Sequence, residues 1–298
     1  MGPLDAFVVI DKPSGVTSFS MVSTMRRLTG VRRIGHAGTL DPLATGVLPL
    51  AIGRATRFIQ YLDDEAKTYV AKVRFGVTTD TYDADGEVTS RADASRLTRD
   101  AIEGALATCA GAIEQVPPVY SAIKVAGKPL YRYAREGAAI EVAPRVVRID
   151  AIRLLSLAPD RAEAEIEVNC GKGTYIRSLA HDLGQRVGCG AHLTALRRTR
   201  SGGFGIHEAH AVPEIEAAAR EGWLEDLLLA PDRAVERRPA AIFSEARERD
   251  VVAGRVVASE RSSAADLCRA YSVDGSFLGL LRNLDGRQWH PEKVLGRG

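Results

Sequence analysis

The alternation of apolar and polar residues predicts several β-strands. Residues 7–10 form a short apolar run, and residues 67–76 alternate in part, as strands do. Residues 146–157 fit a further strand. Between positions 163 and 168 three apolar residues alternate with three glutamates, which predicts an antiparallel strand with one buried and one solvated face. An antiparallel sheet is therefore expected.

Apolar residues at helical spacing predict amphipathic helices between these strands. One helix is expected to begin at Ser18 or Ser20 and to end at Gly30. Two more are expected after Thr98 and Thr174, because a threonine hydroxyl can cap a helix. The apolar faces consist of Val22, Met25 and Leu28; of Ile102, Ala105, Leu106 and Cys109; and of Ile176, Leu179, Ala180, Leu183 and Val187.

Arg177 falls in the first turn of the last of these helices and outside its apolar face. A cation is unfavourable there, because the N-terminal end of the helix dipole is positive. We therefore expect Arg177 to have a carboxylate partner.

Residues 35–49, GHAGTLDPLATGVLP, carry a single acid, Asp41, followed directly by Pro42. The proline biases Asp41 away from the helical region, and the glycines allow a close approach of the backbone to another chain. A loop of this kind can present a carboxylate into a cleft. An ordinary turn explains the same residues, and the spacing alone does not decide between the two interpretations.

Later segments predict turns and a small C-terminal module. Acids gather at positions 80–85, but no glutamate closes an EF-hand loop, so DADG at 83–86 is interpreted as a solvated turn. Prolines and charges at 231–239 predict a linker. Beyond it, short strands with Asp-Gly pairs at 274–275 and 285–286 predict hairpins, and hence a β module at 239–298.

The chain has 298 residues, of which 26% are charged, and a net charge of only +2. This balance is ordinary for a soluble globular protein of one or two domains. Basic residues nevertheless dominate positions 124–148 and 170–202, whereas acids crowd 214–232. Such clustering suits a partner that carries phosphates, although solvated surface helices would give the same pattern.

The four cysteines form no CxxC pair, so neither a disulfide framework nor a zinc cluster is indicated. The N-terminus lacks a basic leader, and no apolar run approaches the length of a membrane span. We expect a cytoplasmic protein with no membrane association.

Residues 116–137 combine prolines, glycines, three tyrosines and interleaved basic residues. Aromatic rings among lysines and arginines suit stacking on bases together with phosphate contacts. A long surface excursion explains the composition equally well. The candidate residues for contacts with an RNA backbone are Lys124, Lys128, Arg132 and Arg135.

Taken together, six ordered motifs resemble the TruB family of bacterial tRNA pseudouridine-55 synthases. The motifs are VIDKPSGVTS at 9–18, the Asp41 loop at 35–49, KTYVAKVRFG at 67–76, the segment at 116–137, GTYIRSLAHDLG at 173–184 and GAHLTALRRTRSG at 190–202. One departure is Ala37, which stands where many relatives have threonine. The segment beyond Pro239 matches only loosely.

The resemblance implies the architecture and the reaction. It implies an α+β fold, with a mixed α/β catalytic domain at 1–235 built on an antiparallel sheet. An RNA-gripping insertion at 116–145 and a PUA-like RNA-binding module at 239–298 are also implied. The reaction is the isomerisation of uridine 55 in the T-loop of tRNA, by base flipping and without cofactor or metal.

The resemblance also implies roles for individual residues. Asp41 is the catalytic carboxylate, and we expect Arg177 to keep it ionised. Tyr69 stacks on the target uracil and assists proton removal, whereas His36 lies near the flipped nucleotide. Further walls of the pocket are Tyr175 and Leu196. Whether Asp41 adds covalently or assists elimination to a glycal stays open.

Two other functions remain to be weighed. The same grooves would serve a tRNA-binding chaperone with little or no catalysis. A guide-dependent relative that works inside a ribonucleoprotein is disfavoured by the long insertion at 116–137. We expect a monomer that binds the T-arm of tRNA and needs no obligate protein partner.

Overall fold

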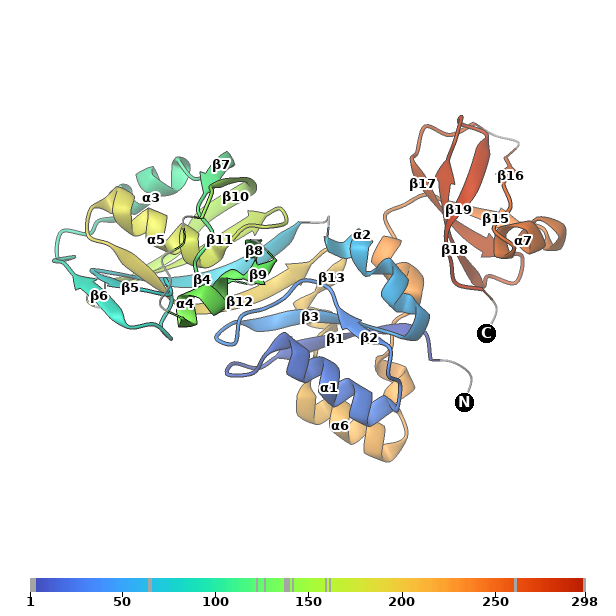
Figure 1. Cartoon of the computed structure of the whole chain (residues 1–298), viewed down its shortest axis with the longest axis horizontal. Helices are drawn as coiled ribbons and strands as arrows, with labels where there is room; N and C mark the ends of the chain where they lie inside the picture. Colours follow the sequence, from blue (N-terminus) through green and yellow to red (C-terminus); the bar gives the residue numbers. More distant parts are fainter. Residues whose placement is uncertain are drawn as a thin grey trace. The chain divides into compact units, whose positions relative to one another are not determined.

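The computed structural model describes residues 4–63, 66–121, 123–125, 127–136, 140, 142–158, 160, 162–259 and 262–296. The chain divides into two compact units, whose segments can be followed by colour in Figure 1. Unit 1 consists of Met1–Leu40, Val47–Glu65 and Ser201–Gly298. Unit 2 consists of Asp41–Gly46 and Ala66–Arg200, and it contains most of the predicted site residues.

Unit 2 is built on a twisted sheet. Its strands, in spatial order, are β12 (Ala191–Ser201), β4 (Lys67–Phe75), β11 (Glu163–Cys170), β10 (Arg145–Ala158) and β7 (Gly111–Gln115). The pairs β4–β11, β11–β10 and β10–β7 are antiparallel, as predicted. The first residues of β3 (Thr45–Ile52) add a parallel pair beside β12, so the sheet is mixed.

The predicted alternation in β11 is confirmed. Ala164, Ile166 and Val168 are buried, whereas the intervening glutamates are only partly covered. Helices α3 (Arg99–Ala107) and α5 (Ile176–Val187) lie side by side against this sheet (Figure 1). The apolar faces of the two helices thus close the core over the buried face of the strands.

The helix caps follow the sequence only in part. Gly30 ends α1 (Ser18–Thr29) in the left-handed conformation and Thr98 caps α3, as predicted. The cap of α1 is Thr17 instead of Ser18 or Ser20, because the Ser18 hydroxyl is buried and bonds to the backbone of Leu40.

The cap predicted for α5 is wrong. Tyr175 occupies the N-cap position without a side-chain cap, and the Thr174 hydroxyl instead donates to the carbonyl of Gly171 at 3.1 Å. Of the predicted stripe on α5, Ile176, Leu179, Ala180 and Leu183 are buried and Val187 is partly exposed, and Arg177 is buried as well.

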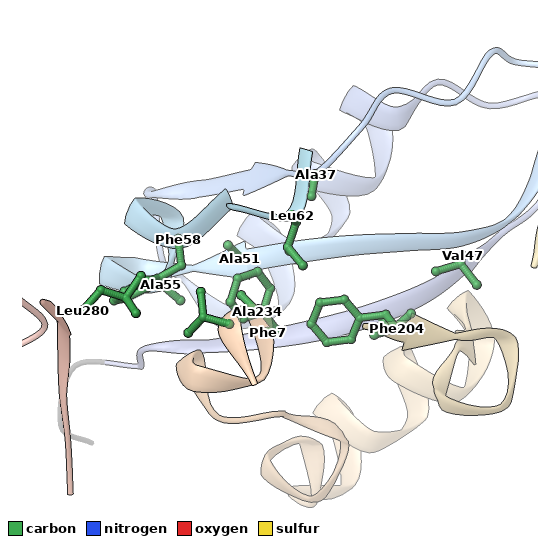
Figure 2. Packing of buried hydrophobic residues seen from close by; sticks show 12 residues of the cluster. Phe7, Ala37, Val47, Ala51, Ala55, Phe58, Leu62, Phe204, Ala234 and Leu280 are labelled. Carbon is green, nitrogen blue, oxygen red and sulfur yellow. The ribbon is translucent and has the colours of Figure 1, made fainter. Parts of the chain in front are cut away.

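In unit 1, β14 (His210–Ala211), β1 (Ala6–Lys12) and β3 follow one another in the sheet order, and β2 (Ile34–His36) pairs with β3. Helices α1 and α6 (Val212–Glu221) pack together (Figure 1). The core next to these strands gathers Phe7, Phe58 and Phe204 (Figure 2).

The prediction of a linker at 231–239 is wrong for its first half. Residues Pro231–Val235 form the short 3-10 helix η5, and Ala234 and Val235 are buried in the cluster of Figure 2. Apolar side chains placed among the polar ones anchor this stretch, which composition alone does not reveal.

The C-terminal part of unit 1 is a small β module, as predicted. Its sheet has the order β15 (Ala240–Phe243), β17 (Leu267–Ser272), β18 (Phe277–Asn283), β19 (Gln288–Val294) and β16 (Val257–Ala258), with α7 (Glu245–Val252) alongside. Gly275 and Gly286, with positive φ, lie in the predicted hairpin turns. The domain boundary at 235–239 stays a prediction.

The remaining elements are short. They are η1 (Gly53–Phe58), α2 (Ile59–Asp63), β5 (Val77–Thr79), β6 (Val88–Arg91), β8 (Lys124–Val125), β9 (Lys128–Pro129), α4 (Leu130–Arg135), β13 (Phe204–Gly205), η3 (Ile206–Glu208) and η4 (Leu224–Leu227). No helix in the described part of the chain combines the length and apolar character needed to cross a membrane.

Gly46 is where β3 meets β12. It lies opposite Arg198 with a φ of +98°, and a Cβ built on it would stand 2.2 Å from the Arg198 carbonyl oxygen. Only glycine fits, because both the conformation and the space exclude a side chain.

We expect Gly46→Ala to lower the free energy of unfolding by about 3–5 kcal/mol, since a left-handed conformation and an overlap with backbone are combined. Gly188→Ala is the matched control in unit 2, because Gly188 has a φ of +86° but no neighbour within 4 Å. It should cost only about 1–2 kcal/mol. Denaturant unfolding measures both, and equal destabilisation would show that the approach to Arg198 is unimportant.

Candidate active site

Asp41 lies in a turn that leads into β3. The backbone N–H of Ala44 donates to the carbonyl of Asp41 at 3.0 Å, which closes a four-residue turn with Pro42 at its second position. The turn and the functional interpretation of this loop are therefore compatible, because the turn leaves the carboxylate of Asp41 directed at a cation.

That cation is Arg177, at the start of α5. Its Nε lies 2.9 Å from Oδ2 of Asp41. The N–H is not aligned for a hydrogen bond, so the contact is an ion pair. The Arg177 side chain is only 5% exposed and that of Asp41 38%. The carboxylate of Asp41 is thus partly open to solvent and pairs with a buried guanidinium.

The rest of the guanidinium is held by a second acid and by backbone carbonyls. Nη2 donates to the carbonyl of Tyr120 at 3.0 Å, and Nη1 donates to that of Thr81 at 3.4 Å. Nη1 also lies 3.6 Å from Oδ2 of Asp83. Charge from two carboxylates therefore offsets the cost of burying Arg177 at the positive end of a helix.

Asp83 corrects the interpretation of the turn at 83–86. Its side chain is only 7% exposed, and its Oδ1 accepts hydrogen bonds from the Thr81 hydroxyl and the Asp85 backbone. The turn composition hid this role, because Asp-rich turns are usually solvated. One signal could have revealed the role of Asp83. The positive charge of Arg177 is only partly compensated by the partly exposed carboxylate of Asp41, which indicates that a second acid is needed nearby.

Tyr69 projects from β4, opposite Val168 of β11, and is buried. Burial raises the pKa of its hydroxyl above the usual value, and the nearby charge of Asp41 adds a smaller increase. A hydrogen bond with Arg198 acts in the opposite direction.

Arg198 corrects another expectation. The sequence places it among the basic residues of a phosphate-binding face, but its side chain is fully buried on β12. Leu196 and Arg198 share the buried face of that strand. Continuing the alternation from Leu196 would have indicated that Arg198 points inward.

Tyr175 is held by its backbone at the start of α5. The side-chain amide of Gln115 donates to the Tyr175 carbonyl at 3.0 Å and accepts from its N–H at 2.7 Å. Burial raises the pKa of the Tyr175 hydroxyl, and the charges of Arg177 and Asp41 both act on it. Tyr69, Tyr175 and Arg177 therefore all lie within electrostatic range of Asp41.

Leu196 is buried, and its carbonyl accepts from the hydroxyl of Thr45, which follows the Asp41 turn, at 3.3 Å. His36 belongs to unit 1, where it ends β2 and pairs with Leu50 of β3. The role of His36 near a flipped nucleotide stays a prediction.

The first residues of the insertion are hydrogen-bonded to α5. The carbonyl of Val116 accepts from the Ser178 hydroxyl at 2.7 Å, next to the contact between Tyr120 and Arg177. Farther along, Lys128 pairs with Glu136 and its Nζ lies 4.6 Å from the centre of the Tyr133 ring. Arg132 is exposed. The side chains of Lys124 and Arg135 lie outside those that the structure describes.

Among the described residues, no cluster of histidine, cysteine and acidic side chains has the arrangement of a metal site. The carboxylate of Asp41 pairs with a guanidinium, and two phenols lie within its electrostatic range. They can stabilise charge, stack on a planar ring and exchange protons.

Comparison with known proteins identifies the family. Residues 26–176 match the model of the N-terminal domain of TruB family pseudouridylate synthases. Residues 177–236 match the model of the tRNA pseudouridylate synthase B C-terminal domain.

Curated relatives agree over nearly the whole chain. The tRNA pseudouridine synthase B of Dehalococcoides mccartyi (strain CBDB1) is 40% identical over 99% of this chain and 97% of the relative. The synthase of Aromatoleum aromaticum is 46% identical over 93% of this chain and 88% of the relative.

Solved structures share the fold. A crystal structure of a Cbf5-Nop10-Gar1 complex contains a chain 25% identical, with a TM-score of 0.70 over 94% of this chain and 78% of that one. A chain in an H/ACA RNP bound to a substrate RNA is 23% identical, with a TM-score of 0.73 over 98% and 85% of the two chains. Both family models and the curated relatives lead to one conclusion: this chain belongs to the TruB family and is a tRNA pseudouridine synthase, an isomerase that converts uridine to pseudouridine in tRNA.

Proposed function

We propose that the enzyme acts on uridine 55 in the T-loop of tRNA, with Asp41 as the catalytic carboxylate. The observation that carries the proposal is the ion pair of 2.9 Å between Asp41 and the buried Arg177. The order and spacing of the motifs around these residues, which resemble those of the pseudouridine-55 synthases, support the choice of the T-loop.

The reaction breaks the bond between C1′ of the ribose and N1 of uracil, turns the base and forms a new bond between C1′ and C5. The proton on C5 then leaves to a base and N1 takes up a proton, so that the product is an isomer of the substrate. The reaction is redox-neutral, and positive character develops at the sugar when the bond breaks. A carboxylate can stabilise this charge or add to it as a nucleophile. Arg177 stabilises the ionised form of Asp41 and holds it in place.

In this proposal the target base leaves the RNA stack and lies against the ring of Tyr69. The raised pKa of Tyr69 keeps its hydroxyl protonated at neutral pH. We propose that Tyr69 contributes the face of its ring, with its hydroxyl in a hydrogen bond with Arg198. Tyr175 and Leu196 form further walls around the base.

Water must be kept from the reacting sugar, yet Asp41 is 38% exposed. We infer that the bound RNA itself covers the carboxylate, with the insertion at 116–145 gripping the T-arm. The contacts of Tyr120 and Val116 with α5 support this inference, because they join the base of the insertion to the helix that carries Arg177. We further propose that the enzyme acts as a cytoplasmic monomer on naked tRNA, without a guide or protein partner.

The first test is Asp41→Asn, assayed as pseudouridine formation in a T-loop hairpin by the pure protein without cofactor. The wild type should convert the hairpin. The variant should be at least about 10²–10³-fold slower while its RNA affinity stays within a few-fold, because charge is removed and shape is kept.

Asp100→Asn, on the exposed face of α3, is the matched control and should retain full activity. An active Asp41→Asn would remove Asp41 from the mechanism, and an inactive wild type that binds the hairpin would favour the chaperone.

Tyr69 provides a second test. Tyr69→Leu should slow turnover by about 10–100-fold, because stacking of a base on an aromatic ring is worth about 1–3 kcal/mol. Tyr69→Phe keeps the ring and should be much less impaired in single-turnover assays. Equal impairment of the two variants would assign the role of Tyr69 to its hydroxyl and not to its ring.

The insertion is tested by the salt dependence of tRNA binding. Replacing Lys124, Lys128, Arg132 and Arg135 with glutamine should weaken binding at low salt. The slope of log K against log [salt] should become shallower by about 0.7–0.9 for each phosphate that the variant no longer neutralises. Arg99→Gln combined with Arg153→Gln removes exposed, acid-paired arginines of unit 2 as a control. A slope unchanged in the fourfold variant would show that the insertion does not touch phosphates.

A further inference from the structure

The turn that carries Asp83 contains a residue in a rare conformation. Tyr82 has a φ of +63°, and among the described residues only Ala162 is another non-glycine residue with positive φ. Glycine or asparagine is the usual choice for this region, because a larger side chain is strained there. The surroundings of Tyr82 must therefore supply interactions that hold it.

The ring of Tyr82 lies against His181 of α5. The ring centres are 4.0 Å apart and the planes differ by 19°, a stacked pair. Burial lowers the pKa of His181, which favours the neutral imidazole, and Asp182 is the charged neighbour of both rings. The pair thus joins the strained residue to the helix by aromatic contact.

His181 follows Arg177 by one helical turn, so both side chains lie on the same side of α5. The residues on either side of Tyr82 are Thr81 and Asp83, which provide a carbonyl and a carboxylate to Arg177. Helix α5 therefore contacts this turn through two side chains. Arg177 binds the Thr81 carbonyl and the Asp83 carboxylate, and His181 stacks on the ring of Tyr82 between them.

The backbone of the turn is also fixed from the other side. The carbonyl of Tyr82 accepts from the N–H of Leu193 at 3.0 Å, and the Thr79 hydroxyl donates to the carbonyl of Asp83 at 2.7 Å. These bonds set the path of the chain, whereas the contacts of Arg177 and the stack with His181 tie the turn to α5.

We propose that Tyr82 and His181 are positioning residues for catalysis. Their stack fixes the turn so that Thr81 and Asp83 keep the guanidinium of Arg177 against Asp41. This inference rests on the proposed role of the Asp41–Arg177 pair. If the inference holds, the rate of the chemical step depends on the rings of Tyr82 and His181, although neither ring is in contact with the carboxylate of Asp41.

The test is Tyr82→Gly, because glycine tolerates the left-handed conformation and only the ring is removed. We expect the variant to fold, judged by its melting temperature, and to bind T-loop RNA within about twofold of the wild type. Its single-turnover rate at saturating enzyme should fall at least about tenfold, since small displacements of catalytic groups are costly. His181→Ala should behave alike, whereas Tyr82→Phe and His181→Phe, which keep flat rings, should restore most of the rate.

A double-mutant cycle separates positioning from general packing. If the stack acts through Asp83, then adding Tyr82→Gly to Asp83→Asn should slow the reaction by no more than about twofold beyond Asp83→Asn alone. An unchanged rate in Tyr82→Gly, or full additivity in the cycle, would overturn the inference. Measuring Asp41→Asn in the same assay distinguishes the failure of this inference from the failure of the proposed function. An active Asp41→Asn variant would refute the proposed function. An inactive Asp41→Asn variant together with a fully active Tyr82→Gly variant would refute only the positioning role of Tyr82 and His181.

Discussion

The active-site half of the molecule depends on one buried cation. A guanidinium that is almost fully covered, at the positive end of a helix, is tolerated only when acceptors and negative charge surround it. For Arg177 they come from Asp41, from Thr81 and Asp83 in one turn, and from Tyr120, which together represent three separate segments of the chain. The need to satisfy this one side chain therefore brings together the Asp41 loop, the turn before β6 and the root of the insertion. In the proposed mechanism the same charge keeps the carboxylate of Asp41 ionised.

The sheet supplies the fixed frame for that arrangement. Tyr69 on β4 and Leu196 and Arg198 on β12 are all buried, as residues on the inner face of strands are. Gly46 lets the strand after Asp41 lie directly against the backbone of Arg198. Asp41 is thus carried on a short turn that leads directly into the strand paired with β12.

The start of the insertion and the residues around Asp41 are held by the same structural elements. The segment that begins the insertion contributes a carbonyl to Arg177 and another to Ser178, and Gln115 just before it holds the backbone of Tyr175. The mechanism proposed above draws on this arrangement for charge stabilisation and for stacking on the base.

The sequence by itself determined the family, through long motifs in order, and it determined features that depend on neighbours in the chain: the alternation of β11, the cap at Thr98, the helix end at Gly30 and the hairpins at Gly275 and Gly286. It even indicated that Arg177 needs a carboxylate. Only the tertiary structure decided that Asp83 is buried beside Arg177, that Arg198 lies inside, and that η5 packs in the core. The physical reason is the sequence separation of the residues that interact. Periodicity and capping are set by residues two to four positions apart, whereas the burial and pairing of a charge depend on segments that meet only when the chain has folded.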